Sequence, residues 1–224
     1  MEDWERKKKI MEQKLQKHID LLVERYPQLG VCAEDIKAAY EILEASFSND
    51  GKLLVCGNGG SAADSEHIVG ELMKGFKLPR KLDDDYREKL KSVDPELGTV
   101  LAENLQGALP AIALDGHVAL TTAYMNDCEP LLCFAQQVNG FGNKQDVLLG
   151  ISTSGNSKNV LYAAITAKAK GMKVIGLTGQ KVNMLEKIAD VTIHVPQTET
   201  YMIQELHLPV YHCLCLMLED HFYN

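Results

Sequence analysis

The sequence predicts an α/β protein with a parallel β-sheet covered by helices on both faces. Short hydrophobic segments alternate with helical ones along most of the 224 residues, and their nearly unbroken apolar character is typical of strands buried on both faces. Two of these segments run directly into small, hydroxyl-rich turns. Because 46 % of the residues are hydrophobic, the chain can build a full core, and we expect one domain spanning residues 1–224.

Two amphipathic helices are expected in residues 1–50, before the first strand. Over 4–25, apolar side chains recur at helical spacing until Pro27, and 33–48 begins with acidic residues that suit a helix N-terminus. A last helix is expected over 200–222. The predicted strands are 52–57, 110–114, 146–151, 172–178 and 190–195.

The segment 77–107 lengthens the connection between the first sheet helix and the second strand well beyond a usual loop, and it is dense in charge. Its apolar residues nevertheless keep helical spacing, with Pro95 predicted to separate two short helices. We interpret the segment as a helical insertion within the domain. Two roles stay open for it: a lid or wall over the site, or a subunit contact or decorated surface.

Charge and hydropathy argue against several functions. A net charge of −8 and a pI near 5.4 argue against general binding to nucleic acid or anionic membranes, which needs clustered Lys and Arg. The N-terminus lacks an apolar signal core, and no stretch approaches the ~20 apolar residues of a membrane span. We therefore expect a cytoplasmic protein without nucleic-acid or membrane partners, in which local groups hold any anionic ligand.

The first hydroxyl-rich turn has two interpretations. Its sequence GNGGSA, residues 57–62, satisfies the G-x-G-x-x-A form of a dinucleotide fingerprint. That kind of site also needs an acidic residue about 20 positions on, at the end of the next strand, whereas Asp83 to Asp85 follow no strand. No Walker lysine follows either turn. We therefore favour a phosphate turn and expect no nucleotide cofactor.

The second turn, STSGNS at 152–157, offers four hydroxyls in six residues and a glycine that lets the backbone approach a ligand. A serine-rich helix cap without a ligand is the alternative. Two such turns at the carboxyl ends of parallel strands favour a ligand, because open α/β sheets bind ligands at that edge. Together the turns predict a site for a phosphorylated sugar.

Three sequence segments, CGNGGSAAD, GISTSGNS and IQELHLPVYH, resemble the SIS (sugar isomerase) domain. Within that family the chain is most similar to the phosphoheptose isomerases, which interconvert sedoheptulose 7-phosphate and glycero-manno-heptose 7-phosphate. The resemblance implies a flavodoxin-like three-layer fold with a five-stranded parallel sheet, assembled as a homotetramer with sites at subunit interfaces. The residues that point to this branch are His67, Glu71, Gln204 and His212.

The resemblance also implies a role for each matched residue. Glu71 and His212 would be the catalytic acid/base pair. The substrate and its phosphate would be held by Asn58, Gly59, Gly60, Ser61, Ser152, Thr153, Ser154, Ser157 and Gln204. A zinc ion, one per subunit, would be bound by His67, Glu71, Gln204 and His212.

The chemistry of aldose–ketose interconversion supports the acid/base pair independently. A base must move a proton between neighbouring carbons, and Glu71 suits that role if burial raises its pKa towards neutrality. His212 can shuttle the proton between the two oxygens. His67 lies four residues before Glu71, so both project from one helix face. If zinc is bound, Glu71 cannot serve freely as metal ligand and as base at once.

Two other functions stay open: a non-catalytic SIS module that binds a phosphosugar or docks on a protein, and an isomerase of a different sugar phosphate. The presence of Glu71 and His212 favours the enzyme, since a sensor needs no acid/base pair. Gly75 stands where the phosphoheptose isomerases have an arginine, which bears on substrate identity. Pro209 is expected to kink the final helix before His212.

Overall fold

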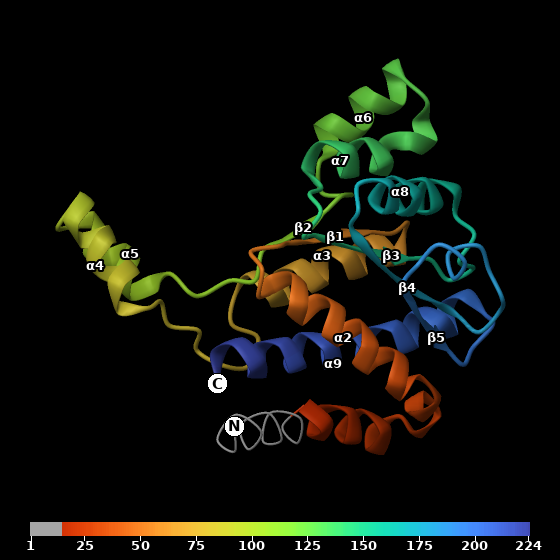
Figure 1. The fold of residues 1–224 in the computed structure, drawn as a ribbon, viewed down its shortest axis with the longest axis horizontal. Coiled ribbons are helices and arrows are strands. Elements are labelled where there is room, and N and C mark those ends of the chain that lie inside the picture. The colour runs from red at the N-terminus through yellow and green to blue at the C-terminus, as the bar shows by residue number, and fades with distance from the viewer. Residues whose placement is uncertain (1–14) are drawn as a thin grey trace.

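The computed structural model describes residues 15–224, so the part of the expected first helix before residue 15 lies outside the described residues. At its centre is a five-stranded, all-parallel sheet with the strand order β2-β1-β3-β4-β5. Helices cover both faces of the sheet (Figure 1), which confirms the predicted fold class. The strands are β1 (Leu53–Cys56), β2 (Ala111–Ala113), β3 (Val147–Ile151), β4 (Lys173–Gly179) and β5 (Val191–Val195).

The helices alternate with the strands as predicted. Residues 15–25 are helical and belong to the expected first helix. None of the described helices has the length and apolarity needed to cross a membrane. The remaining helices, with 3-10 helices marked η, are η1 (Pro27–Cys32), α2 (Ala33–Phe47), α3 (Gly60–Met73), α4 (Asp84–Val93), α5 (Leu97–Asn104), α6 (Val118–Asp127), η2 (Pro130–Leu132), α7 (Cys133–Phe141), α8 (Lys158–Ala169) and α9 (Thr200–Tyr223).

The sheet is buried on both faces because successive strand residues point to opposite sides. Leu53 and Val55 of β1 join a core formed with α2, α3 and α9, whereas Leu54 and Cys56 join a second core formed with α7 and α8. Every residue of β1 and β3 is buried. This two-sided burial explains why the strands read as unbroken apolar segments.

The strand order has a switch point between β1 and β3. The chain leaves β1 towards β2 on one side and later continues from β3 towards β4 on the other, so the two connections run in opposite directions. Ligands of open α/β sheets bind at such a switch point, outside the carboxyl ends of the strands. The turns at 57–60 and 152–157 directly follow these two strands.

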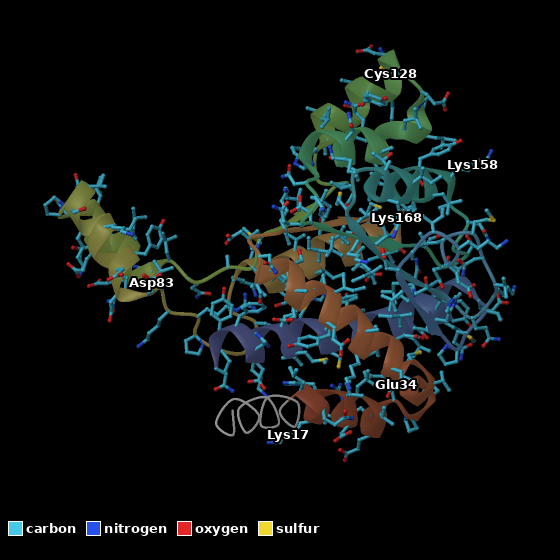
Figure 2. All side chains as sticks on the ribbon, viewed as in Figure 1. Lys17, Glu34, Asp83, Cys128, Lys158 and Lys168 are labelled. Atoms are coloured by element: carbon cyan, nitrogen blue, oxygen red, sulfur yellow. The ribbon has the colours of Figure 1, made fainter. Side chains whose placement is uncertain are left out.

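α4 and α5 form an arm that stands away from the rest of the molecule (Figure 1). Asp83, labelled at the foot of the arm in Figure 2, caps α4 by accepting a 2.8 Å hydrogen bond from the backbone N–H of Tyr86. Pro95 lies between the two helices, which confirms the predicted break. Val93 and Leu97 are 87 % and 66 % exposed, so the arm presents an apolar surface to solvent.

α9 is one continuous helix through Pro209. The kink expected at this proline therefore does not interrupt it. Packing explains the continuity, because α9 lies against α2 and α3 and Pro209 itself is buried. Gln204 and His212 consequently stay on one helix, and both face α3.

Candidate active site

The first turn leads from β1 into α3, and its shape depends on glycine. Gly59, the N-cap residue of α3, has a φ of +59°, in the left-handed region that other residues rarely adopt. The helix begins with Gly60, so the positive end of the α3 dipole lies at the carboxyl edge of the sheet. Ser61 is buried beneath this turn, while Asn58 is exposed at its tip. The turn therefore has the electrostatics of an anion site.

A pair of side-chain amides joins the first turn to the start of α8, just after the second turn. Asn58 Nδ2 donates to Asn159 Oδ1 over 3.0 Å, and Asn159 Nδ2 donates back to Asn58 Oδ1 over 2.8 Å. Both bonds are made between segments about one hundred residues apart in the chain. The structure thus brings the two turns predicted to hold phosphate side by side.

The second turn concentrates its hydroxyl groups at the carboxyl end of β3. Ser152 Oγ and Ser157 Oγ lie 3.0 Å apart, and Ser154 is exposed. Gly155 has a φ of +63°, and a Cβ there would overlap the side chain of Asn183. Only glycine fits this position, because both the backbone angle and the neighbouring side chain exclude a larger residue.

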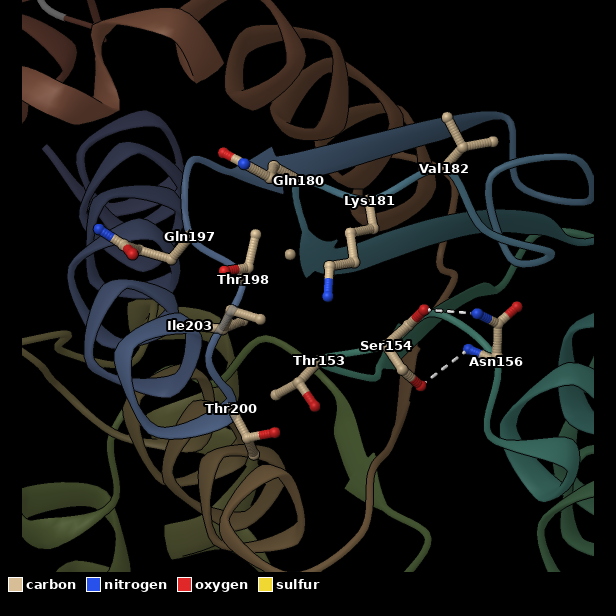
Figure 3. Close-up of a pocket in the computed structure, with 11 residues that line it drawn as sticks. Thr153, Ser154, Asn156, Gln180, Lys181, Val182, Gln197, Thr198, Thr200 and Ile203 are labelled. Atoms are coloured by element: carbon tan, nitrogen blue, oxygen red, sulfur yellow. Dashed lines mark hydrogen bonds between the residues drawn. The ribbon is translucent and has the colours of Figure 1, made fainter.

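A pocket of about 330 Å³ opens beside this turn, at the carboxyl ends of β3, β4 and β5 (Figure 3). Thr153 and Ser154 form one wall, and Thr198 and Thr200 form the wall opposite. The ammonium group of Lys181 points into the space between them (Figure 3). Among the described residues, no carboxylate lines this pocket. Its chemistry suits an anion.

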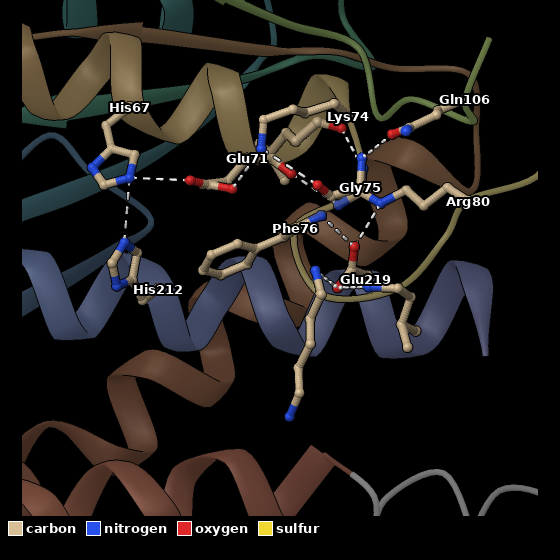
Figure 4. Close-up of polar contacts among 12 residues, drawn as sticks. His67, Glu71, Lys74, Gly75, Phe76, Arg80, Gln106, His212 and Glu219 are labelled. Atoms are coloured by element: carbon tan, nitrogen blue, oxygen red, sulfur yellow. Dashed lines mark hydrogen bonds and ion pairs between the residues drawn. The ribbon is translucent and has the colours of Figure 1, made fainter. Parts of the chain in front are cut away.

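His67 is the centre of a polar cluster between α3 and α9 (Figure 4). Its Nε2 lies 3.1 Å from Glu71 Oε1 and 3.5 Å from His212 Nε2, while its Nδ1 lies 2.9 Å from the Tyr211 hydroxyl. Tyr211 in turn donates to Asp64 Oδ1 over 3.2 Å. The structure thus brings the predicted pair, Glu71 and His212, together around one imidazole.

The surroundings of the two predicted catalytic groups favour proton transfer. The Glu71 side chain is 13 % exposed, and its second oxygen accepts a hydrogen bond of 3.3 Å from the Lys74 ammonium. Burial lowers the pKa of His212; His67 and Arg25 lower it further, whereas Glu71 raises it. His212 is therefore neutral at pH 7 and can accept or donate a proton.

A buried ion pair fixes the end of α3 that carries Glu71 (Figure 4). Glu219 accepts a 2.9 Å hydrogen bond from Arg80 Nε and three more, of 2.7 to 3.1 Å, from the backbone N–H groups of 76–78. Arg80 also donates to the carbonyl oxygens of Glu71 and Leu72, which lie in the last turn of α3. Both charged residues are 1 % exposed. The pair therefore holds the helix end and the following loop together.

Three of the four predicted zinc ligands, His67, Glu71 and His212, lie together, but Gln204 does not join them. A Cβ added to Gly60 would lie 2.6 Å from Gln204 Nε2, so Gln204 faces the start of α3, whereas His212 faces His67. Eight residues of helix separate Gln204 from His212 by about 12 Å along α9. Within residues 15–224, no group of three or more His, Cys, Asp and Glu side chains is placed to hold a metal ion.

Comparison with known proteins first gives the class. Residues 28–87 and 91–179 match the SIS domain family, so the fold and its two turns define an SIS-domain protein. The phosphoheptose isomerase of Helicobacter pylori strain P12 is 39 % identical over 84 % of this chain and 85 % of that protein. The phosphoheptose isomerase of Rhodospirillum rubrum is 36 % identical over 94 % of this chain and 98 % of that protein. The chain belongs to the phosphoheptose isomerase family.

Solved structures agree with this assignment. Phosphoheptose isomerase GmhA from Neisseria gonorrhoeae superimposes with a TM-score of 0.70 at 30 % identity, covering 93 % of this chain and 98 % of that one. A phosphoheptose isomerase from Francisella tularensis also gives a TM-score of 0.70, at 32 % identity, covering 92 % of this chain and 98 % of that one.

Sequence reasoning did not single out several residues that the structure places beside the predicted ones or in the pocket. Lys181 lies in a loop without periodicity, so nothing in the sequence points to it. The other residues act through contacts between α3 and α9, which pattern alone does not place. The sequence could have pointed to Glu219, because a residue seven positions after His212 lies on the same helix face. These residues are Asp64, Arg80, Tyr211 and Glu219.

Proposed function

We propose that this protein is an aldose–ketose isomerase that interconverts sedoheptulose 7-phosphate and glycero-manno-heptose 7-phosphate. The observation that carries the proposal is the contact of Glu71 and His212 with the same His67 nitrogen, at 3.1 and 3.5 Å. A base and a proton shuttle thus meet beside α3, the helix that begins at the first phosphate-type turn. Membership in the phosphoheptose isomerase family supports the same reaction and substrate.

In this proposal the substrate phosphate lies at the serine turn 152–157, with the turn at 57–61 beside it. Serine and threonine hydroxyls, backbone N–H groups and the positive end of α3 supply the contacts that a phosphate monoester needs. Gln204, packed against Gly60, is placed to contact the sugar chain next to the phosphate. The roles of these residues can each be tested by substitution.

The proton transfer takes place at the other end of the site. Glu71 removes the proton from C1 of the ketose, leaving an enediolate, and returns it to C2 to give the aldose. His212, neutral at pH 7, carries a proton between the two oxygens. His67 orients Glu71, and the Lys74 ammonium adds positive charge near the developing enediolate.

The length of the site favours a long, open-chain substrate. Gln204 marks the phosphate end and His212 the carbonyl end, and about 12 Å of helix separates them. An aldose or ketose with phosphate on its last carbon has its phosphate and its reacting carbons, C1 and C2, at opposite ends of the open chain. A heptose 7-phosphate satisfies this separation better than a shorter sugar phosphate does.

Proton exchange tests the mechanism directly. Sedoheptulose 7-phosphate is incubated with the protein in deuterated water, and exchange at C1 and C2 is followed by NMR. Glu71→Gln is expected to slow exchange at least about 10²-fold, because the base is lost. Glu66→Gln removes an exposed carboxylate from the same helix and is the matched control, expected at the wild-type rate. If Glu71→Gln exchanges as fast as wild type, the mechanism is wrong. A wild-type protein that binds the sugar without exchange is a phosphosugar-binding regulator.

We further propose a homotetramer with sites at subunit interfaces. The arm supports an assembly, because α4 and α5 pack mainly on each other and leave Val93, Leu97 and Val100 exposed at 87 %, 66 % and 55 %. An apolar surface of this kind favours association. Light scattering measures the mass, and Leu97→Glu should lower it, whereas Glu103→Gln on the same helix should not.

Zinc bound by His67, Glu71, Gln204 and His212 stays a prediction of the family resemblance. Such binding requires Gln204 to leave Gly60 and turn towards His212. Metal analysis of protein purified without added zinc tests it. A cytoplasmic location, and the absence of a nucleotide cofactor and of nucleic-acid or membrane partners, likewise stay predictions.

A further inference from the structure

We propose that Lys181 is a phosphate-binding residue of this site, whose ammonium group pairs with the substrate phosphate across the pocket from the serine turn. This inference rests on the proposed function, since it names the group that neutralises the phosphate of that substrate. The pocket in Figure 3 lies where the loops after β3, β4 and β5 meet. Lys181 belongs to the loop after β4, the middle of the three.

The composition of the pocket points to an anion. Hydroxyl groups come from Thr153 and Ser154 on one side and from Thr198 and Thr200 on the other. Glu199, although it lies between the two threonines in sequence, does not line the pocket. On a chain with a net charge of −8, a concave site with an ammonium group and no carboxylate departs from the general charge. A neutral ligand would not need this arrangement.

The ammonium group of Lys181 makes no ion pair or side-chain hydrogen bond with any residue from 15 to 224. Other lysines in the same half of the sheet are engaged: Lys168 and Lys173 both pair with Asp190, at 2.9 and 3.0 Å. Lys181 instead points into the pocket, between Ser154 and Thr198 (Figure 3). Its charge is therefore available to a ligand.

The backbone of the Lys181 loop is fixed relative to the serine turn. Asn183 Nδ2 donates to the Lys181 carbonyl oxygen over 3.0 Å, and Asn183 is 4 % exposed. The N–H of Met184 donates to Asn156 Oδ1, also over 3.0 Å. The loop and the turn thus form one hydrogen-bonded unit, so the backbone of Lys181 keeps a fixed position relative to the serine turn before any ligand binds.

The Lys181 ammonium supplies the positive charge that the neutral hydroxyls of the pocket cannot offer to a phosphate. A phosphate monoester carries a charge of about −1.5 to −2 at pH 7, whereas hydroxyls and backbone N–H groups are neutral donors. Charge-assisted hydrogen bonds are roughly twice as strong as neutral ones. Lys181 therefore supplies selectivity for the dianion over an uncharged sugar.

Titration of inorganic phosphate into the full-length protein by isothermal calorimetry at pH 8 tests the proposal. Lys181→Gln is expected to weaken binding at least about tenfold, because a charge-assisted contact is lost. Lys181→Arg keeps the charge and should stay within a few-fold of wild type. Lys187→Gln, an exposed lysine six residues on and outside the pocket, is the matched control and should bind as wild type does. Since Lys181 is exposed, thermal unfolding should be unchanged in all three variants.

Three results would overturn the proposal: no phosphate binding by wild type, a Lys181→Gln affinity within twofold of wild type, or equal weakening by Lys187→Gln, which would indicate only a general field. The outcome is separable from that of the proposed function. If phosphate binds as expected but no phosphosugar exchanges protons, Lys181 is a phosphate ligand and the isomerase assignment is wrong. If wild type isomerises the sugar and Lys181→Gln leaves both phosphate affinity and KM unchanged, the isomerase stands and Lys181 is not a ligand.

Discussion

The Glu219→Gln substitution removes a negative charge from a buried position while keeping the size of the side chain. Each oxygen of Glu219 accepts two hydrogen bonds, and the donors are Arg80 Nε and the backbone N–H groups of 76–78. In glutamine, one oxygen becomes an NH2 group that faces N–H donors. Two hydrogen bonds are then lost, and the Arg80 guanidinium, which is fully buried, loses its counter-charge.

The expected cost follows from that geometry. Removing one partner of a buried ion pair destabilises a protein by about 3–5 kcal/mol, because the remaining charge is left uncompensated. We expect the free energy of unfolding of Glu219→Gln to fall by this amount. Catalysis should also slow, since Arg80 holds the Glu71 carbonyl at 2.9 Å and the pair fixes the end of α3. KM should change little, because the phosphate turns lie at the other end of the helix.

Urea unfolding, followed by circular dichroism, measures the stability change, and proton exchange by NMR measures the rate. Glu103→Gln, an exposed carboxylate in α5, is the control and should change stability by less than about 0.5 kcal/mol. The double variant Arg80→Met with Glu219→Gln should be less destabilised than the sum of the single variants, because each single variant leaves one buried charge unpaired and the double variant leaves none. A cost below about 1 kcal/mol for Glu219→Gln, or strict additivity in the double variant, would refute the reasoning.

Three further outcomes are expected. Burial lowers the pKa of His207 from 6.5 to about 4. Between these pH values the unfolded chain binds a proton at His207 that the folded chain does not. The free energy of unfolding therefore keeps its full value above pH 6.5 and falls by about 3 kcal/mol as the pH drops to about 4. Urea unfolding at pH 5 and 7.5 should show about 2 kcal/mol of this loss in wild type but not in His207→Phe. In Gly60→Ala the new Cβ displaces the Gln204 amide, so KM should rise several-fold while Tm stays within a few degrees; an unchanged KM would argue against a substrate role for Gln204. Tyr211→Phe removes the hydrogen bond to His67, so kcat should fall about fivefold with KM unchanged, and an unaltered kcat would contradict a positioning role.

The sheet could be predicted from the sequence because each strand is buried on both sides. The prediction for residues 146–151 corresponds to β3 at Val147–Ile151, and the other strands agree as closely. The break at Pro95 was equally predictable, because proline excludes the helical interior. The same rule gave a different outcome at Pro209, where packing against α2 and α3 keeps α9 continuous. Local propensity decided the outcome on the exposed arm, and tertiary packing decided it in the core.

Spacing along one helix also predicted part of the candidate site. His67 and Glu71, four residues apart, share a helix face and contact each other at 3.1 Å. The contact of Arg80 with Glu219 joins residues 139 positions apart and depends on how α3 and α9 lie together, which no local pattern specifies. The direction of Gln204 also depends on that packing. Sequence periodicity gives the face of a helix, and its partner follows only from the assembled fold.

The reciprocal amide pair of Asn58 and Asn159 has a consequence for the thermodynamics of binding. Each amide satisfies the other, so the first turn and the start of α8 are already linked in the free protein, beside the site where a ligand binds. A ligand that enters it orders few side chains and keeps most of its intrinsic binding energy, since little entropy remains to be lost from these turns. Affinity at this edge of the sheet therefore depends on which groups the turns present rather than on a rearrangement that brings them together.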